Sequence, residues 1–339
     1  MFLMMQDFKS ESQLFSYCDE VYKEGKAPAL HLYILIPMND ISPEEMAENA
    51  IRRDLQCNLY KKSHRLYQIT IGIRTSTEVG YLLVDDKYWI FISDQRSVEV
   101  TRVVNSFVRK LFPILSWAYV PSKKLIQLID DFSQDYDKIL FLDGTLGSKD
   151  TTIRNWKKEP VEFSVEFLTK YEKQQKLKFT TLSFAGFIEN KQVIKARIHT
   201  RGHLALYYGF FGDFYSDLVL NYIAESLNLE ESFLNRERKI VKDKVEIYPL
   251  KFELEENLTI GQIETLKSKL QKMYLSAVFH TGNPSLMIQL TDFGDGSSFD
   301  FYVYKNIIEI VPLVKASPGA ITKLFAFISE FFPTAKLLE

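Results

Sequence analysis

The chain has 339 residues, of which 46% are apolar and 25% are charged, and its formal net charge is −2. This composition is typical of a globular protein and excludes a disordered chain. Because the net charge is close to zero, the protein as a whole has no electrostatic potential that would attract nucleic acid or anionic lipid. The longest apolar runs, such as Leu32–Met38, are far shorter than the roughly 20 residues that cross a bilayer, so we expect no membrane association.

Residues 1–65 predict a small α/β segment. A helix is expected around Glu11–Lys23 and a strand over Leu30–Ile36. A second helix begins at Ser42-Pro43, because Ser42 is suited to the N-cap, proline to the first helical position, and Glu45 to closing a capping box.

Residues 66–132 predict the first of three similar units, each a β-meander followed by a helix. Its strands are Tyr67–Arg74, Tyr81–Val84 and Tyr88–Ile92. In its helix, apolar residues recur at the spacing that forms one buried stripe, and Phe112-Pro113 ends it. Residues 133–178 are polar and rich in lysine and glutamine, and we expect a linker with a short strand there.

The same pattern recurs in residues 179–244 and 245–339. In the second unit, strands Phe179–Ile188, Gln192–His199 and His203–Phe210 precede a helix. In the third, an additional strand and helix come before the meander. Three matched units favour an α+β fold with antiparallel sheets from about three repeated β-meander–helix units, plus the small N-terminal α/β segment.

The motifs that could carry catalysis are incomplete. Ile139–Leu146 resembles the first motif of haloacid-dehalogenase-type phosphatases, but Phe141 stands where that family has its nucleophilic aspartate. We therefore interpret this run as a strand that ends in an Asp-Gly turn. His199 and His203 have the spacing of a helical zinc pair, but they flank a predicted turn and no third ligand is evident, so we expect neither a metal nor a cofactor.

The basic residues form the candidate binding site. In the strand that ends near Arg201, alternate residues are basic and the others are apolar, so one strand face is basic and is expected to meet solvent or an anionic partner. A second cluster is interleaved with Tyr60 and Tyr67, an arrangement that suits phosphate contact with base stacking. The predicted nucleic-acid-binding residues are Lys195, Arg197, His199 and Arg201 on the first surface, and Arg52, Arg53, Lys61, Lys62 and Arg65 in the second.

Cys18 and Cys57 are isolated in the sequence, which is typical of proteins in a reducing compartment. The residues Met1–Met5 are apolar but lack the basic residues of a signal peptide. We therefore expect a cytoplasmic protein. The leading hypothesis is a non-enzymatic recognition or scaffold subunit of a complex. It would bind a partner protein, nucleic acid or both through the basic sheet face. One alternative is an enzyme with an unrecognised site, for which Asp143, Asp292–Ser298 and the pair His199 and His203 are the candidate residues. The other is a small-molecule sensor with a pocket between modules.

Overall fold

The computed structural model describes Leu3 and residues 6–25, 27–37, 41–74, 76–95, 97–147, 154–156, 159–175, 177–234, 238–241, 244–247, 249–281, 285–313 and 316–338. The chain divides into two compact bodies. The N-terminal body comprises Met1–Gly147 with Thr152–Leu227, and the C-terminal body comprises Asn228–Glu339 with Ser148–Thr151. The finer five-segment division that the sequence suggests remains a prediction.

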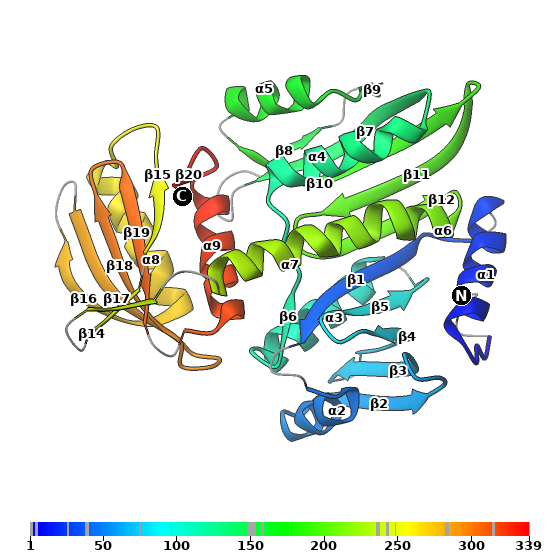
Figure 1. The fold of residues 1–339 in the computed structure, drawn as a ribbon, viewed down its shortest axis with the longest axis horizontal. Coiled ribbons are helices and arrows are strands. Elements are labelled where there is room, and N and C mark those ends of the chain that lie inside the picture. Colours follow the sequence, from blue (N-terminus) through cyan, green and yellow to red (C-terminus); the bar gives the residue numbers. More distant parts are fainter. Residues whose placement is uncertain are drawn as a thin grey trace. The chain divides into compact units, whose positions relative to one another are not determined.

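Helices and strands alternate along the N-terminal body (Figure 1). Its helical segments are α1 (Glu11–Lys23), α2 (Pro43–Arg52), α3 (Ser97–Leu111), α4 (Ser122–Phe132), the 3-10 turn η2 (Ser133–Asp135), α5 (Val165–Gln175), α6 (Phe211–Asp213), the π-helical η3 (Phe214–Val219) and the first part of α7 (Leu220–Leu234), whose residues from Asn228 onwards are counted with the C-terminal body. Its strands are β1 (Leu30–Pro37), β2 (Gln56–Lys61), β3 (Leu66–Ile73), β4 (Ser76–Val84), β5 (Trp89–Ser93), β6 (Leu115–Trp117), β7 (Lys138–Gly147), β8 (Arg154–Trp156), β9 (Val161–Glu162), β10 (Lys178–Ile188), β11 (Lys191–His199) and β12 (His203–Tyr208).

One 12-stranded antiparallel sheet forms the centre of this body. Its main order is β2-β3-β4-β5-β1-β12-β11-β10-β7-β8, with β6 paired to β1 and β9 paired to β7. Strand β1 joins the two halves, because Leu32 lies opposite Ile92 of β5 on one side and Leu204 of β12 on the other. The first two predicted meanders, β3-β4-β5 and β10-β11-β12, therefore belong to a single sheet.

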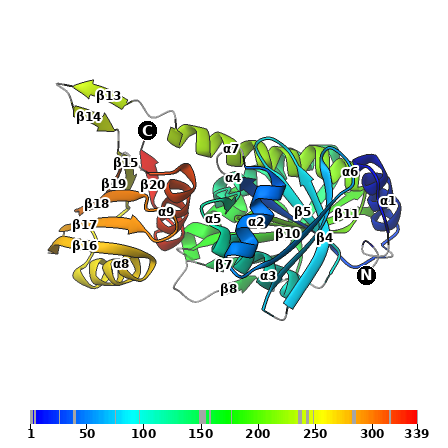
Figure 2. The ribbon, with the colours of Figure 1, turned by 90° about the horizontal axis from the view of Figure 1, so that it is seen from below.

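The two halves of the sheet are covered differently. In the β1–β5 half, alternate side chains enter two separate apolar clusters: Leu32 packs in a cluster that includes residues of α1, α4 and α7, and Tyr33 packs in one that includes residues of α2 and α3. Figure 2 shows α7 and α3 on opposite sides of strands β4 and β5. In the β12-β11-β10-β7 half, the face towards α4 and α7 carries the large apolar cluster, with Leu204, Ile198 and Phe184.

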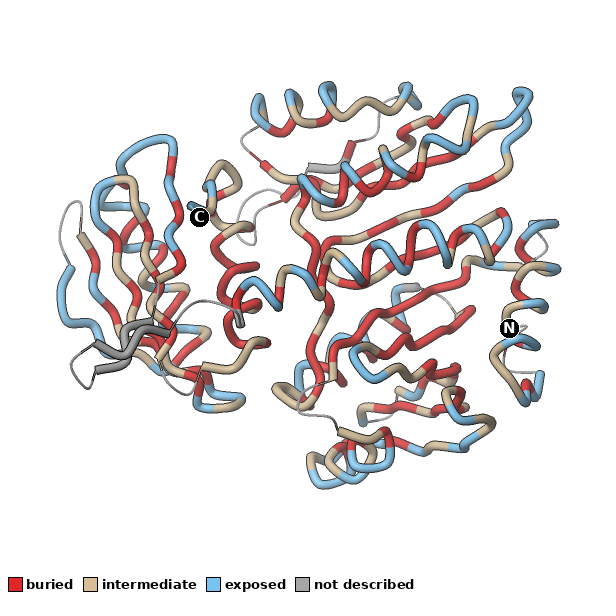
Figure 3. Tube along the Cα trace, viewed as in Figure 1, coloured by how far each residue is buried: buried red, intermediate tan, exposed pale blue. Residues whose placement is uncertain are grey.

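The C-terminal body holds a 6-stranded antiparallel sheet in the order β16-β17-β18-β19-β15-β20 and a separate hairpin. Its elements are β13 (Arg238–Val241), β14 (Lys244–Ile247), β15 (Leu250–Glu253), α8 (Ile260–Met273), β16 (Tyr274–Thr281), β17 (Ser285–Asp292), β18 (Ser298–Tyr304), β19 (Ile307–Pro312), α9 (Pro318–Phe331) and β20 (Lys336–Leu338). Buried and accessible residues alternate along β17, β18 and β19, so one sheet face forms the core (Figure 3).

The predicted fold class is confirmed: the protein is α+β with antiparallel sheets, and three meanders are each followed by a helix. The capping box of α2 is also present, with Ser42 and Glu45 bonding each other's backbone N–H. Residues 133–178 differ from the expected linker, because they contribute the ten-residue strand β7 and helix α5. Lysine and glutamine favour helices as much as linkers, so composition alone did not separate the two.

Candidate functional site

The second meander carries a polar surface on the sheet face opposite α4 and α7, which we call the polar face. Strand alternation places Ile194, Ala196 and Ile198 of β11 in the apolar core. Their neighbours Lys195, Arg197 and His199 lie on the other side, as predicted. The polar face comprises Lys195, Arg197 and His199 of β11, His203 and Tyr207 of β12, Thr181 and Ser183 of β10, and Asp143 and Thr145 of β7.

Strand register brings three polar side chains of this face together across β7, β10 and β11. Ser183 lies opposite Arg197 on one side and Asp143 on the other. Arg197 Nε donates to Ser183 Oγ at 2.7 Å, and Arg197 Nη2 lies 3.1 Å from Asp143 Oδ1. Ser183 Oγ in turn donates to Asp143 Oδ1 at 2.9 Å. These bonds hold the Arg197 guanidinium against the sheet surface, and the Arg197 side chain is 39% exposed.

Asp143 and Gly144 lie inside β7, where the sequence suggested the end of a strand and a turn. Pairing between β7 and β10 shifts register between Ser183 and Phe184, and this irregularity accommodates the dipeptide within the strand. Gly144 is required there, because a Cβ atom would lie 2.9 Å from the carbonyl oxygen of Thr181. Asp143 is therefore a partner of Arg197 rather than a turn residue.

Two cations lie over one aromatic ring at the exposed end of the polar face. Lys195 Nζ is 5.8 Å and Arg197 Cζ is 5.7 Å from the ring centroid of the half-buried Tyr207. Lys195 is exposed, and within the described residues no carboxylate pairs with its ammonium group. This end of the face therefore presents one free positive charge, one partly engaged guanidinium and an aromatic ring.

Three histidines line the other end. His31 of β1 is buried, and its Nδ1 lies 3.1 Å from His203 Nε2. The His203 ring stacks on the buried Tyr33 ring at 4.5 Å with an interplanar angle of 4°. Arg201 N donates to His199 Nδ1 at 2.9 Å, so a neutral His199 carries its proton on Nε2.

These histidines are held neutral at physiological pH. Burial, with a smaller contribution from the Arg197 charge, lowers the pKa of His31 to about 4. Burial, with the neighbouring Arg201, lowers the pKa of His199 to about 4. Burial likewise holds the pKa of His203 well below its ordinary value. The histidine end of the face therefore offers hydrogen-bond donors and acceptors rather than positive charge.

A cavity of about 540 Å³ opens on the polar face. It is lined by Asp143, Gly144, Thr145, Trp156, Thr181, Arg197, His199 and His203. Trp156 lies opposite Gly144 of β7, is 5% exposed, and packs edge-on against Tyr171 of α5 with the ring centroids 4.8 Å apart. The volume lies in the range of about 300 to 1,000 Å³ that is typical of small-ligand pockets.

The neutral histidines predict an acid-sensitive N-terminal body. Their folded-state pKa values lie below the value of 6.5 for a free histidine, so between about pH 6.5 and pH 4 the unfolded chain binds more protons and acidification favours unfolding. The free energy of unfolding should fall by up to about 1.4 kcal/mol per pH unit for each histidine. Urea unfolding monitored by tryptophan fluorescence at pH 7, 6 and 5 measures this loss.

The matched substitutions are His31→Gln at the buried site and His64→Gln at an exposed site. The first should flatten the pH dependence relative to the unsubstituted protein, and the second should leave it unchanged. Equal pH profiles for all three proteins would contradict a role for the buried histidines.

The second predicted basic cluster is largely engaged within the chain. Arg53 Nη1 donates to the carbonyl oxygens of Lys110 and Phe112 at 2.6 and 3.0 Å. Lys62 Nζ lies 2.6 Å from Asp7, and Arg65 Nη2 lies 2.7 Å from Asp85. Among the five predicted residues of this cluster, the exposed Lys61 instead lies over the Tyr67 ring at 5.5 Å.

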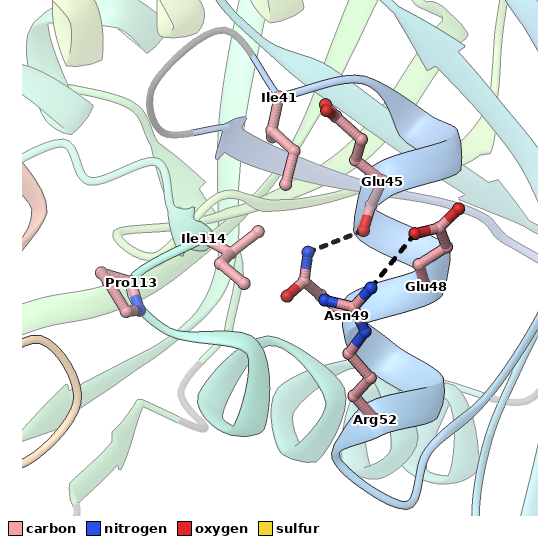
Figure 4. A pocket seen from close by; sticks show the side chains of 7 residues that line it. All are labelled: Ile41, Glu45, Glu48, Asn49, Arg52, Pro113 and Ile114. Atoms are coloured by element: carbon pink, nitrogen blue, oxygen red, sulfur yellow. Dashed lines mark hydrogen bonds and ion pairs between the residues drawn. The ribbon is translucent and has the colours of Figure 1, made fainter.

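Arg52 borders a second cavity, of about 420 Å³, beside α2 (Figure 4). It forms an ion pair with Glu48 at 3.5 Å, one helical turn earlier, and Glu45 also lines the cavity. Two carboxylates beside one arginine do not favour a phosphate group. Arg201, the last residue predicted on the first surface, follows the end of β11 and is half-buried in the turn before β12.

The loop over Asp292–Ser298, another place that the sequence suggested, is held by bonds to its own residues and to α9. Side-chain and backbone hydrogen bonds close the loop over Asp292–Ser298 on itself, and Lys323 of α9 pairs with Asp292 at 2.5 Å. Across the described part of the chain, no three histidine, cysteine or acidic side chains converge as metal ligands. The sequence had indicated Arg197 and His199, but Asp143, Ser183 and His31 join them through pairings that no local pattern reveals.

No protein-family model matches the chain, and no curated protein matches it significantly. In the described residues, every helix is too short or too polar to cross a bilayer.

Proposed function

We propose that the protein is a non-enzymatic recognition subunit that binds single-stranded nucleic acid on the polar face. The observation that carries the proposal is the placement of Lys195 and Arg197 over Tyr207, beside a cavity lined with neutral polar groups. Cations that accompany an aromatic ring suit a phosphate next to a stacked base. The predicted cytoplasmic location and a partner protein are compatible with this role and belong to the same proposal.

Each part of the polar face has a distinct role in this proposal. Lys195 neutralises a backbone phosphate, since it is exposed and has no carboxylate partner among the described residues. Tyr207 offers a ring for base stacking. His199 and Thr181 line the cavity, and we propose that the His199 Nε2–H and the Thr181 hydroxyl bond the edge of an unpaired base there.

The ligand is expected to be single-stranded because the hydrogen-bonding groups lie inside a cavity. A base within a duplex cannot enter it without leaving its stack. The small number of free cations on the face also favours a short contact of one or two phosphates over a long duplex track. Binding should therefore depend only moderately on salt concentration.

Fluorescence anisotropy with labelled 12-nucleotide single strands of RNA and DNA tests the proposal. We expect Lys195→Glu to weaken binding by about tenfold at 50 mM salt, because it replaces an attraction to phosphate by a repulsion. Tyr207→Leu should weaken it by about five- to one-hundredfold, through the loss of stacking of about 1 to 3 kcal/mol. Lys272→Glu on α8 changes the net charge by the same amount at an exposed site of the C-terminal body.

Equal affinities for the Lys195→Glu and Lys272→Glu variants, or no binding by the unsubstituted protein at 50 mM salt, would overturn the proposal. Unlabelled adenosine and uridine monophosphates serve as competitors. If they displace the strand at concentrations near its own Kd, the site takes a free nucleotide, which is the small-molecule role that the cavity volume favours as the second candidate.

A further inference from the structure

The cavity on the polar face suits an uncharged group better than a phosphate. Among the described residues that line it, Asp143 and Arg197 are the charged ones, and their charges cancel in the ion pair at 3.1 Å. The histidines and threonines of the lining are neutral. A phosphate group placed in the cavity would meet the Asp143 carboxylate, whereas an uncharged base would not be repelled. In a bound strand, the base therefore enters the cavity and the phosphate stays outside it, near Lys195.

Asp143 gives the cavity a carboxylate that can accept further hydrogen bonds. Its Oδ1 accepts from Ser183 Oγ at 2.9 Å and from Arg197 Nη2 at 3.1 Å. Its Oδ2 has a longer contact with the same Nη2, at 3.4 Å, and the Asp143 side chain is 47% exposed. Each carboxylate oxygen has two lone pairs, so Oδ2 keeps most of its capacity to accept N–H groups of a ligand.

His199 and Arg197 provide donors on the other side of β10. His199 Nδ1 accepts from the Arg201 N–H, so the neutral ring presents Nε2–H as a donor. Arg197 bonds Ser183 through Nε and Asp143 through Nη2, and its Nη1 N–H groups can donate to a ligand. Strand β10 separates β7 from β11, so about 10 Å lies between the strands that carry the acceptor and the donors. One base above β10 can therefore bond both sides.

Guanine is the base whose edge fits a carboxylate and a donor placed in this way. It has two neighbouring N–H donors, at N1 and N2, and the acceptor O6 lies beside N1. Adenine and cytosine have an acceptor nitrogen beside their amino group, and uracil has a carbonyl oxygen on each side of its N–H. Each of these three bases would place a lone pair against the Asp143 carboxylate, which costs binding energy.

We propose that the cavity selects guanine, a selectivity that rests on the proposed binding of single-stranded nucleic acid to the polar face. Asp143 accepts hydrogen bonds from guanine N1–H and N2–H, and the His199 Nε2–H and Arg197 donate to O6. Lys195 contacts the phosphate, and Tyr207 stacks on a neighbouring base. Asp143 is then the residue that determines base specificity.

Fluorescence anisotropy with labelled 12-nucleotide strands of uridine that carry one central guanosine, adenosine, cytidine or inosine tests the selectivity. The adenosine, cytidine and all-uridine strands should bind about 20- to 100-fold more weakly than the guanosine strand. Inosine keeps O6 and N1–H but lacks the 2-amino group. The inosine strand should therefore bind about tenfold more weakly than the guanosine strand, through the loss of one hydrogen bond to a charged group.

The outcomes of this titration separate the selectivity from the proposed function. Equal affinities for all five strands would overturn the selection of guanine. If Lys195→Glu still weakened the binding of these strands, the recognition role of the polar face would stand without it. Absence of binding by every strand at 50 mM salt would overturn both.

Asp143→Asn tests the residue that determines the preference. The amide keeps the size of the side chain and one acceptor oxygen, but its NH2 group is a donor and would face a donor of guanine. The ratio of the guanosine-strand to the adenosine-strand affinity should fall from at least about 20 to below about 3. The ratio is the proper measure, because the loss of a negative charge tightens the binding of all strands alike.

Asp86→Asn is the matched control. It removes the same charge at an exposed residue in the connection between β4 and β5, and it should keep the ratio of the unsubstituted protein. Circular dichroism checks that both variants are folded. An Asp143→Asn protein that is folded and still prefers guanosine by the original ratio would overturn the role of Asp143.

Discussion

Replacement of Lys323 by methionine is expected to lower the free energy of unfolding of the C-terminal body by about 3 kcal/mol. Lys323 Nζ of α9 lies 2.5 Å from Asp292 Oδ2, and the Asp292 side chain is 1% exposed. Removal of the cation would leave a buried carboxylate that still accepts a hydrogen bond from the Gly294 N–H at 2.7 Å. The Lys323 side chain is 37% exposed, which places the effect at the lower end for buried pairs.

Two optical probes separate the bodies in this experiment. Trp89, Trp117 and Trp156 are the three tryptophans of the chain, and all belong to the N-terminal body. In urea unfolding of the Lys323→Met variant, far-UV circular dichroism should show an early transition that tryptophan fluorescence does not. The double variant Asp292→Asn with Lys323→Met should recover much of the loss, because the charge without a partner is gone.

An early transition of the same size in the double variant would contradict this account, since packing and not charge would then be responsible. The result also bears on the enzyme alternative. The sequence suggested the Asp292–Ser298 loop as a candidate catalytic site. In the structure, Lys323 Nζ lies beside the Asp292 carboxylate and 5.2 Å from the ring centroid of Tyr274. A large loss of stability would favour a structural role for this pair.

Much of the architecture follows from periodicity in the sequence. Apolar residues at helical spacing predict the helix α3, and alternation of basic and apolar residues predicts the strand β11. Both patterns involve only residues of the same element, and the structure confirms both predictions. The same alternation placed Lys195, Arg197 and His199 on one side of β11. Local pattern is sufficient for such features because the geometry of a single strand or helix determines them.

The rest depends on pairings between distant segments. His31 and His203 are 172 residues apart in sequence, and they meet only because β1 pairs with β12. Asp143 reaches Arg197 across β10 in the same way. Nothing in either segment specifies the partner, so the sequence predicts a basic strand face but not that a carboxylate and three neutral histidines share it.

The second large effect is expected at Glu172 of α5, where Glu172→Ala should destabilise the N-terminal body by about 3 kcal/mol. Glu172 is 2% exposed and accepts hydrogen bonds from the Ser122 hydroxyl of α4, the Phe179 N–H at 2.7 Å and the Lys178 ammonium at 3.2 Å. The alanine variant leaves all three donors without this acceptor. Urea unfolding monitored by tryptophan fluorescence measures the change.

Two control variants separate the contributions. Glu172→Gln keeps the shape and one acceptor oxygen, so it should cost less than Glu172→Ala, and Ser122→Ala removes a single donor and should cost about 1 kcal/mol. Equal stability of Glu172→Ala and the unsubstituted protein would show that α5 is held by apolar packing alone. That packing includes Leu168, which is fully buried.

The same variant links stability to the polar face. Glu172 follows Tyr171, whose ring supports Trp156 in the cavity wall, so loss of the carboxylate should loosen that wall without touching a ligand. Glu172→Ala should therefore weaken binding of a single-stranded oligonucleotide under conditions where the protein is still folded, while Ser122→Ala leaves binding near its original value. Unchanged affinity in a destabilised but folded Glu172→Ala protein would place the ligand away from Trp156, nearer to Lys195 and Tyr207.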